Sequence, residues 1–152
     1  YTEASLILQQ ANTMGFAPQF FGCDGMDGIL QVQNFDVKLA EGLMLLTPFA
    51  ADATDDLTVK FVKSFEDAYG ETPIQFAADA YDAIYIIKAA MEEANVTPDM
   101  AVGDICDAME GAMTKIKVDG LTGTNMTWTE DGEPENDPKA VQGVDGAYKA
   151  ME

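Results

Sequence analysis

Two carboxylates stand near each other in a glycine-rich segment, Cys23-Asp24-Gly25-Met26-Asp27-Gly28. The segment follows an apolar run from Gln19 to Gly22, which predicts a strand. The carboxylates would then lie at the C-terminal end of that strand, where open α/β sheets bind ligands. An ionised carboxylate accepts charge-assisted hydrogen bonds, so Asp24 is a candidate for holding a cationic group. The alternative is an Asx turn that only shapes the loop.

Catalysis is the less favoured use of these two groups. Asp24 and Asp27 need not converge, and no nucleophile or oxyanion donor accompanies them. The sequence has no His, so Ser-His-Asp and Cys-His arrangements cannot be built. No G-x-S-x-G, P-loop or dinucleotide fingerprint is present. We expect a protein that is not an enzyme and has no cofactor, and a reaction run by carboxylates alone is the one enzymatic alternative.

The charge balance excludes two classes of partner. The chain has 8 basic and 27 acidic residues, for a net charge of −19, and every basic residue is a Lys. Such a polyanion would be repelled by nucleic acid and by an anionic membrane surface. No apolar run approaches the length of about 20 residues that spans a bilayer. The composition therefore predicts an acidic globular protein that does not bind nucleic acid.

Metal binding and disulfide formation receive little support. With only Cys23 and Cys106 to supply sulfur and no His, a zinc site is not expected. The acidic loop from Glu130 to Pro138 carries oxygen ligands but lacks the spacing of an EF-hand, so a solvated turn is the favoured interpretation. The two cysteines are either a pair or two separate small hydrophobic residues. We expect no metal site.

The hydrophobic pattern predicts an α/β protein. Apolar spacing and turn residues predict helices at about 2–14, 29–34, 55–69, 74–94 and 102–113. Thr2 is the candidate cap of the first helix, and Asp104 or an earlier residue is that of the last. Strands are expected at 19–22 and 42–48, in an alternating stretch around 126–129, and at 139–144 as the last strand. Strands followed by helices favour a mainly parallel sheet. The helix at 74–94 is apolar nearly all round and is expected to be deeply packed.

Several runs in unbroken order carry a resemblance to a known family. They are YTEASLILQQANTMGFAPQFFGCDGMDG, AEGLMLLTPF, FVKSFEDAYGETPIQFAADAYDAIYIIKAAMEEA, GLTGTNMTWTEDGEP and KAVQGVDGAY. Together they resemble the later half of extracytoplasmic type I solute-binding proteins of the leucine/isoleucine/valine class. The resemblance implies a type I periplasmic-binding-protein fold, with two Rossmann-like or flavodoxin-like lobes that have parallel sheets, present here as a partial chain.

The resemblance also implies a division into lobes. Residues 1–49 would belong to the second lobe, 50–118 to the first lobe after a hinge crossover near Phe49, and 119–152 to the second lobe again. The upstream segment that holds the ligand's α-carboxylate in the family would be missing. The last strand departs from the pattern, since Gln142 and Gly143 stand where a β-branched pair is expected, and this predicts a weakened strand.

Three site residues follow from the resemblance. Asp24 would pair with the α-ammonium group of a bound amino acid. Tyr1 stands where the family often has an aromatic residue against the ligand, and a frayed terminus is its alternative. Phe76 would form a wall for an aliphatic side chain, and packing in the core is its alternative.

The function implied by the resemblance is transport. The chain would belong to the substrate-binding component of an ABC importer, which captures a branched-chain amino acid between two lobes and delivers it to a permease. The parent protein would be extracytoplasmic, periplasmic or a cell-surface lipoprotein. The chain begins at Tyr1 with no leader, so no signal peptide is expected in it, and the missing segment or self-association would complete it. A ligand-sensing or self-associating module of the same fold is the alternative.

Overall fold

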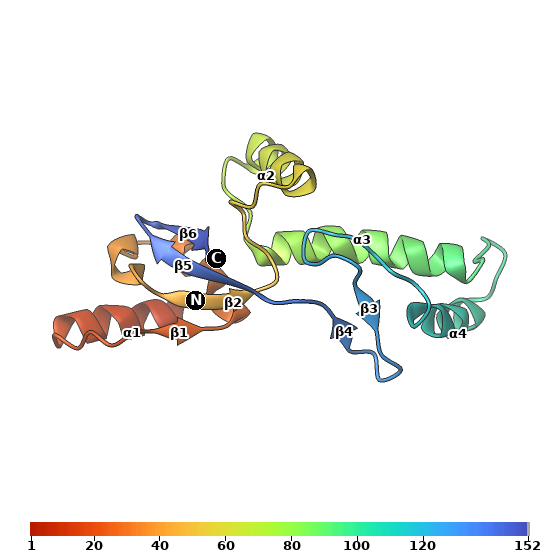
Figure 1. Ribbon diagram of the computed structural model, residues 1–152, viewed down its shortest axis with the longest axis horizontal. Coiled ribbons are helices and arrows are strands. Elements are labelled where there is room, and N and C mark those ends of the chain that lie inside the picture. Colours follow the sequence, from red (N-terminus) through yellow and green to blue (C-terminus); the bar gives the residue numbers. More distant parts are fainter. Residues whose placement is uncertain (152) are drawn as a thin grey trace. The chain divides into compact units, whose positions relative to one another are not determined.

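The computed structural model of the protein describes residues 1–151 and contains two compact units. The first unit comprises Tyr1–Gln75 and the C-terminal segment from Pro138, and the second comprises Phe76–Asp137. Figure 1 shows the elements of both in chain order. Each unit is described by itself, and the predicted lobe boundaries at 49 and 118 stay a prediction.

A four-stranded mixed sheet forms the centre of the first unit. Its order is β1-β2-β5-β6, and only β1 and β2 run parallel, with Phe21 opposite Met44. The strands are β1 (Phe21–Gly22), β2 (Met44–Thr47), β5 (Lys139–Val144) and β6 (Ala147–Ala150). The expectation of a mainly parallel sheet is therefore wrong for this sheet, because β5 returns antiparallel to β2 and a tight turn adds β6. The turn residues Asp145 and Gly146 both have positive φ.

Two α-helices of the first unit begin and end close to where the sequence places them. The helix α1 (Thr2–Thr13) starts with Tyr1 as its N-cap, so Thr2 is a helical residue and not the cap. In α2 (Asp56–Tyr69), the Asp55 carboxylate accepts from the Thr58 amide at 2.9 Å and Gly70 ends the helix at φ 75°. These are the preferred N-cap and C-terminal residues of α-helices.

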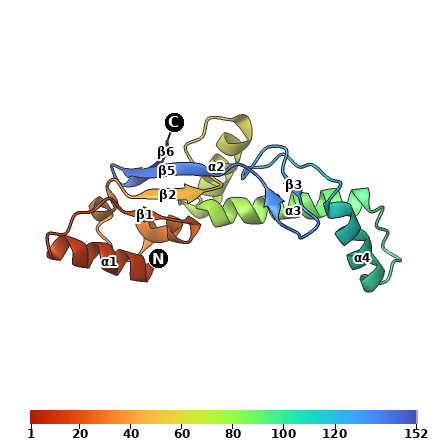
Figure 2. The same ribbon diagram turned by 60° about the horizontal axis from the view of Figure 1, so that its bottom comes forward.

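The segment after β1 is helical. It forms a 3₁₀ helix, η1 (Asp24–Gln31), where the sequence predicts a loop followed by a helix at 29–34. A second 3₁₀ helix, η2 (Val37–Ala40), follows. Ile29 at the centre of η1 is fully enclosed in the core of the first unit, together with Leu8, Leu43 and Leu45. Burial of this apolar face explains why the glycine-rich segment is ordered as a helix. Figure 2 shows α1 beside one face of the sheet.

Gly143 in β5 is a requirement of the packing and not a defect of the strand. A Cβ atom at this position would collide with the backbone oxygen of Ala40. The Gly143 amide also donates to the Leu43 carbonyl at 2.8 Å, and the Gly42 amide donates to the Gly143 carbonyl at 2.8 Å. The prediction of a weakened strand is wrong, because glycine permits this close approach and the strand spans Lys139–Val144 as expected.

The second unit consists of two helices and a short hairpin. The helix α3 (Gln75–Glu93) starts at the last residue of the first unit. The N-cap of α4 (Val102–Met113) is Ala101, which is the earlier of the two expected alternatives and not Asp104 itself. The alternating stretch around 126–129 forms β3 (Thr127–Trp128), which pairs with β4 (Pro134–Glu135), a short strand inside the segment expected to be a loop. Its core contains Ala90, Ile116, Val118 and Met126.

The expectation that α3 is deeply packed is wrong for this chain. Ile84 is 66% exposed, and Tyr85 and Ile87 are also exposed.

Along the described part of the chain, no helix is both long and apolar enough to cross a membrane.

Candidate functional site

Asp24 lies at the start of η1, directly after β1. Its side chain is exposed, and its Oδ1 accepts a hydrogen bond from the Gly25 amide at 2.8 Å. This contact is the local turn role that the sequence offers as the alternative. No other donor within residues 1–151 bonds to the carboxylate, so its second oxygen remains available to a ligand.

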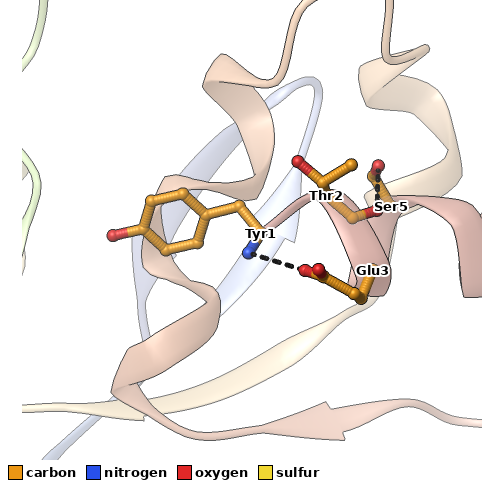
Figure 3. A network of polar contacts seen from close by, with 4 residues as sticks. All are labelled: Tyr1, Thr2, Glu3 and Ser5. Carbon is orange, nitrogen blue, oxygen red and sulfur yellow. Dashed lines mark hydrogen bonds and ion pairs between the residues drawn. The ribbon is translucent and has the colours of Figure 1, made fainter.

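The Tyr1 ring lies on η1, against Gly28. It covers Gly28 so closely that a Cβ atom on Gly28 would collide with it. Figure 3 shows the ring turned away from Glu3 and Ser5, while the terminal amino group lies 3.9 Å from the Glu3 carboxylate. Burial raises the pKa of the Tyr1 hydroxyl, and the charges of Asp27 and Asp24 raise it further.

Asp27 differs from Asp24 in being buried. Only 8% of it is exposed, and its Oδ2 accepts from the backbone amide of Gln75, the first residue of α3, at 2.5 Å. Removal from water raises the pKa of the Asp27 carboxyl, while the hydrogen bond from Gln75 lowers it, and the first effect is the larger. A helix N-terminus favours a negative charge, so Asp27 caps α3 from 48 residues away in the sequence.

A short chain of polar contacts continues from Gln75. The Thr47 hydroxyl donates to Gln75 Oε1 at 2.8 Å and accepts from the Phe49 amide at 3.2 Å. Both Thr47 and Gln75 are buried. These contacts fix the end of β2 and the start of α3 to η1 within the first unit.

A cavity of about 310 Å³ lies beside Asp27 in the first unit. Its walls are apolar side chains, which include Leu30, Phe49 and Ile74, and its polar groups include Asp52 and Tyr148. Burial and the nearby charge of Asp27 raise the pKa of the Tyr148 hydroxyl well above its usual range. This cavity could not be predicted from the sequence, because its lining comes from four separated parts of the chain.

Phe76, the third predicted site residue, belongs to the second unit. It is the first residue of that unit, and its side chain is 43% exposed. Its ring is therefore not enclosed in the core of the second unit. Tyr1 and Asp24 share the first unit with each other but not with Phe76, whose contact with a ligand stays a prediction.

The remaining ionisable groups form no further site. Within residues 1–151, no cluster of three or more acidic, Cys or His side chains has the geometry to hold a metal ion. Cys23 and Cys106 are both exposed and free, so they are two separate residues and not a disulfide pair. The acidic residues of the segment at 130–137 are exposed.

The second unit contains one buried carboxylate that sequence reasoning missed. Asp82 on α3 accepts hydrogen bonds from the Leu121 amide at 2.9 Å and from the Thr122 amide at 2.8 Å, and it also accepts from the Thr122 hydroxyl. Gly120 lies against it. An acidic residue in an otherwise apolar helical stretch is the signal that could have indicated a buried partner.

The order of elements, with the acidic 3₁₀ helix η1 directly after a parallel strand, defines an α/β protein. A model of periplasmic binding proteins matches residues 2–147, so the chain belongs to the periplasmic binding protein family. Members of this family are transport binding proteins and not enzymes, and membership implies an extracytoplasmic location. The predicted fold class and family are confirmed, as a type I fold present as a partial chain.

Three solved structures illustrate the likeness. The leucine-binding protein LivK from Thermotoga maritima is 22% identical to this chain, with a TM-score of 0.79. The alignment covers 100% of this chain and 41% of the LivK chain. The substrate-binding protein LivJ from Streptococcus pneumoniae, in complex with isoleucine, is 22% identical with a TM-score of 0.77 over 98% of this chain and 41% of its own. A solute-binding protein from Rhodopseudomonas palustris, in complex with benzoate, is 18% identical to this chain, with a TM-score of 0.76. The alignment covers 97% of this chain and 39% of that protein.

The chain thus spans about two fifths of the length of these proteins, which are 39–41% covered. At these identities the likeness establishes the fold. A search of curated proteins finds no match.

Proposed function

We propose that the chain is part of the solute-binding component of an ABC importer that captures a small aliphatic amino acid and delivers it to a permease. The observation that supports this most strongly is Asp24, an exposed carboxylate with one free oxygen, beside Tyr1 at the end of a parallel strand. Two of the similar structures are named for leucine binding or contain isoleucine. The transport role follows from family analogy.

The proposed mechanism is capture by closure of two lobes. Asp24 would hold the ammonium group, while Tyr1 and Phe76 would contact the aliphatic side chain. The lobes would be residues 1–49 with 119–152 and residues 50–118, and contacts made only in the closed state would favour closure. The chain would neither transform its ligand nor need a cofactor, and the parent would be a periplasmic protein or a surface lipoprotein.

The test is calorimetric titration of the 152-residue chain with leucine, isoleucine, valine and benzoate. Binding of an aliphatic amino acid, weakened about tenfold or more by Asp24→Asn, is the expected result, because a charge-assisted hydrogen bond is lost. Asp131→Asn, the same change in an exposed turn of the second unit, is the matched control and should leave binding unchanged. Binding of benzoate without any amino acid would refute the amino-acid class. No binding of any of the four would refute capture by this chain.

A self-associating module is the second candidate, and the exposed face of α3 favours it. Ile84, Ile87 and Met91 line an open depression on that helix. Contiguous exposed apolar side chains of this kind mark interaction surfaces. Sedimentation velocity over a range of concentrations should then show a dimer that Ile84→Glu abolishes. A monomer at all concentrations would leave the transport component as the only candidate.

A further inference from the structure

The cavity beside Asp27 has the character of a small-molecule site. It measures about 310 Å³, lies entirely among residues of the first unit, and has walls formed by side chains such as Leu30, Phe49, Ile74 and Val141. Ligand sites are concave and mostly apolar, with a small number of polar groups that fix orientation. Tyr1, Asp24 and Phe76, the residues of the proposed amino-acid site, do not line it.

Every charged group on the described lining is acidic. They are Asp27, Asp52 and Glu71, and no Lys accompanies them. Asp52 has a protein partner, since it accepts from the Ala150 amide at 3.1 Å. The Tyr148 hydroxyl also lines the cavity and donates to the Met26 carbonyl at 3.4 Å, a long contact that leaves it free to turn toward a ligand.

Asp27 has a single hydrogen-bond partner. It is more than nine-tenths buried, and the Gln75 amide on Oδ2 is its one hydrogen-bond donor within residues 1–151. Since no fully enclosed side-chain oxygen in that part of the chain lacks a hydrogen-bond partner, Oδ1 is accessible at the lining of the cavity. The three salt bridges in that part of the chain do not involve it. A buried carboxylate normally has a cationic partner or several donors, because an uncompensated buried charge is costly. The raised pKa of the Asp27 carboxyl is consistent with its removal from water.

We propose that this cavity binds a small organic ammonium ion with a short apolar body, whose charged group bonds to Asp27 Oδ1. The apolar walls would enclose the hydrocarbon part. The ammonium group would supply the counter-charge that Asp27 lacks, and Glu71 would add to the negative potential at the lining. A zwitterionic amino acid fits less well, because its carboxylate would meet three acidic residues and no cation.

The test uses three probes of one shape with the 152-residue chain. They are 3-methylbutylammonium, the uncharged 3-methylbutan-1-ol, and leucine, which adds a carboxylate to the amine. Each is titrated into ¹⁵N-labelled protein while the amides of Gln75 and Tyr148 are followed. We expect a saturable shift with the amine, and binding of the alcohol and of leucine at these two amides at least about tenfold weaker.

Two variants and a control examine the role of the cavity. Asp27→Asn keeps the shape and removes the charge, and it should weaken the amine about tenfold or more. Ala51→Leu fills part of the cavity without a change of charge and should also weaken it, so this variant decides the matter if Asp27→Asn does not fold. Asp131→Asn removes one charge from an exposed turn of the second unit and should leave the amine affinity within about twofold.

Four results would overturn the proposal. They are no shift with the amine, equal affinity for the amine and the alcohol, tighter binding of leucine than of the amine at these amides, and full amine affinity in folded Asp27→Asn or Ala51→Leu. Leucine binding that depends on Asp24 is a separate result and bears on the proposed transport function alone.

Discussion

Replacing Asp82 by alanine should destabilise the second unit. Asp82 is only 2% exposed and accepts three hydrogen bonds, from the Leu121 amide at 2.9 Å, the Thr122 amide at 2.8 Å and the Thr122 hydroxyl at 2.7 Å. Each such bond to a charged acceptor contributes about 1.5–3 kcal/mol. The sum is an upper bound, because the variant no longer buries a charge. We expect the free energy of unfolding to fall by about 3–5 kcal/mol.

The assay is urea unfolding followed by the fluorescence of Trp128, the single Trp of the chain, which lies in the second unit. Hydrogen exchange at the Leu121 and Thr122 amides gives a local measurement of the same contact. The matched control is Asp107→Ala on the exposed side of α4, which should change the free energy by less than about 0.5 kcal/mol.

Gly120 offers a test of the specific contact. A Cβ atom there would lie 2.5 Å from the Asp82 carboxylate, so Gly120→Ala should be destabilising in the wild type and less so in the Asp82→Ala background. A cooperative Trp128 transition that shifts by less than about 1 kcal/mol in Asp82→Ala would refute the reasoning. The same conclusion would follow if the two substitutions were additive, because the loop would then be held by other contacts.

Three further predictions concern the first unit. Gly143→Ala should lower the free energy of unfolding by about 1–3 kcal/mol in urea titrations followed by circular dichroism, because the new methyl group meets the Ala40 carbonyl; an unchanged midpoint would contradict this. Gly70→Ala should cost about 1–2 kcal/mol by the same method, since φ is 75° there, and a stabilising effect would show that the helix end rearranges. Carboxyl NMR should give Asp27 a midpoint above 3.8, because burial raises its pKa. The native state then binds this proton more tightly than the unfolded state, so the Asp27 contribution makes stability fall as pH rises from about 4 through that midpoint. The wild-type minus Asp27→Asn difference in stability should show this fall, and a difference that rises with pH would refute it.

The sequence predicted best where local signals and packing agree. In α2, the cap at Asp55 and the glycine at Gly70 bound the helix at the expected positions. The bounds of the strand at 139–144 were also predicted correctly, but it is not the last strand, because a tight turn at Asp145-Gly146 leads into β6. Local signals failed at η1, because its glycines are typical of a loop while Ile29 is buried in the core. They also failed for α3, because an apolar helix does not reveal which of its sides a neighbour covers.

The two aspartates of η1 show why only part of the site could be predicted. Their types and their place after a strand are visible in the sequence, but their burial is not, because it depends on Gln75, 48 residues after Asp27. Asp24 is exposed to water, so a cation that binds its carboxylate replaces solvent and gains little binding free energy. Asp27 has lost most of its contact with water, so a cation that reaches its carboxylate gains more binding free energy. For equal geometry, Asp27→Asn should therefore weaken an ammonium ligand of its cavity more than Asp24→Asn weakens a ligand of the exposed loop. The reverse order would mean that solvent or the α3 N-terminus already compensates the Asp27 charge.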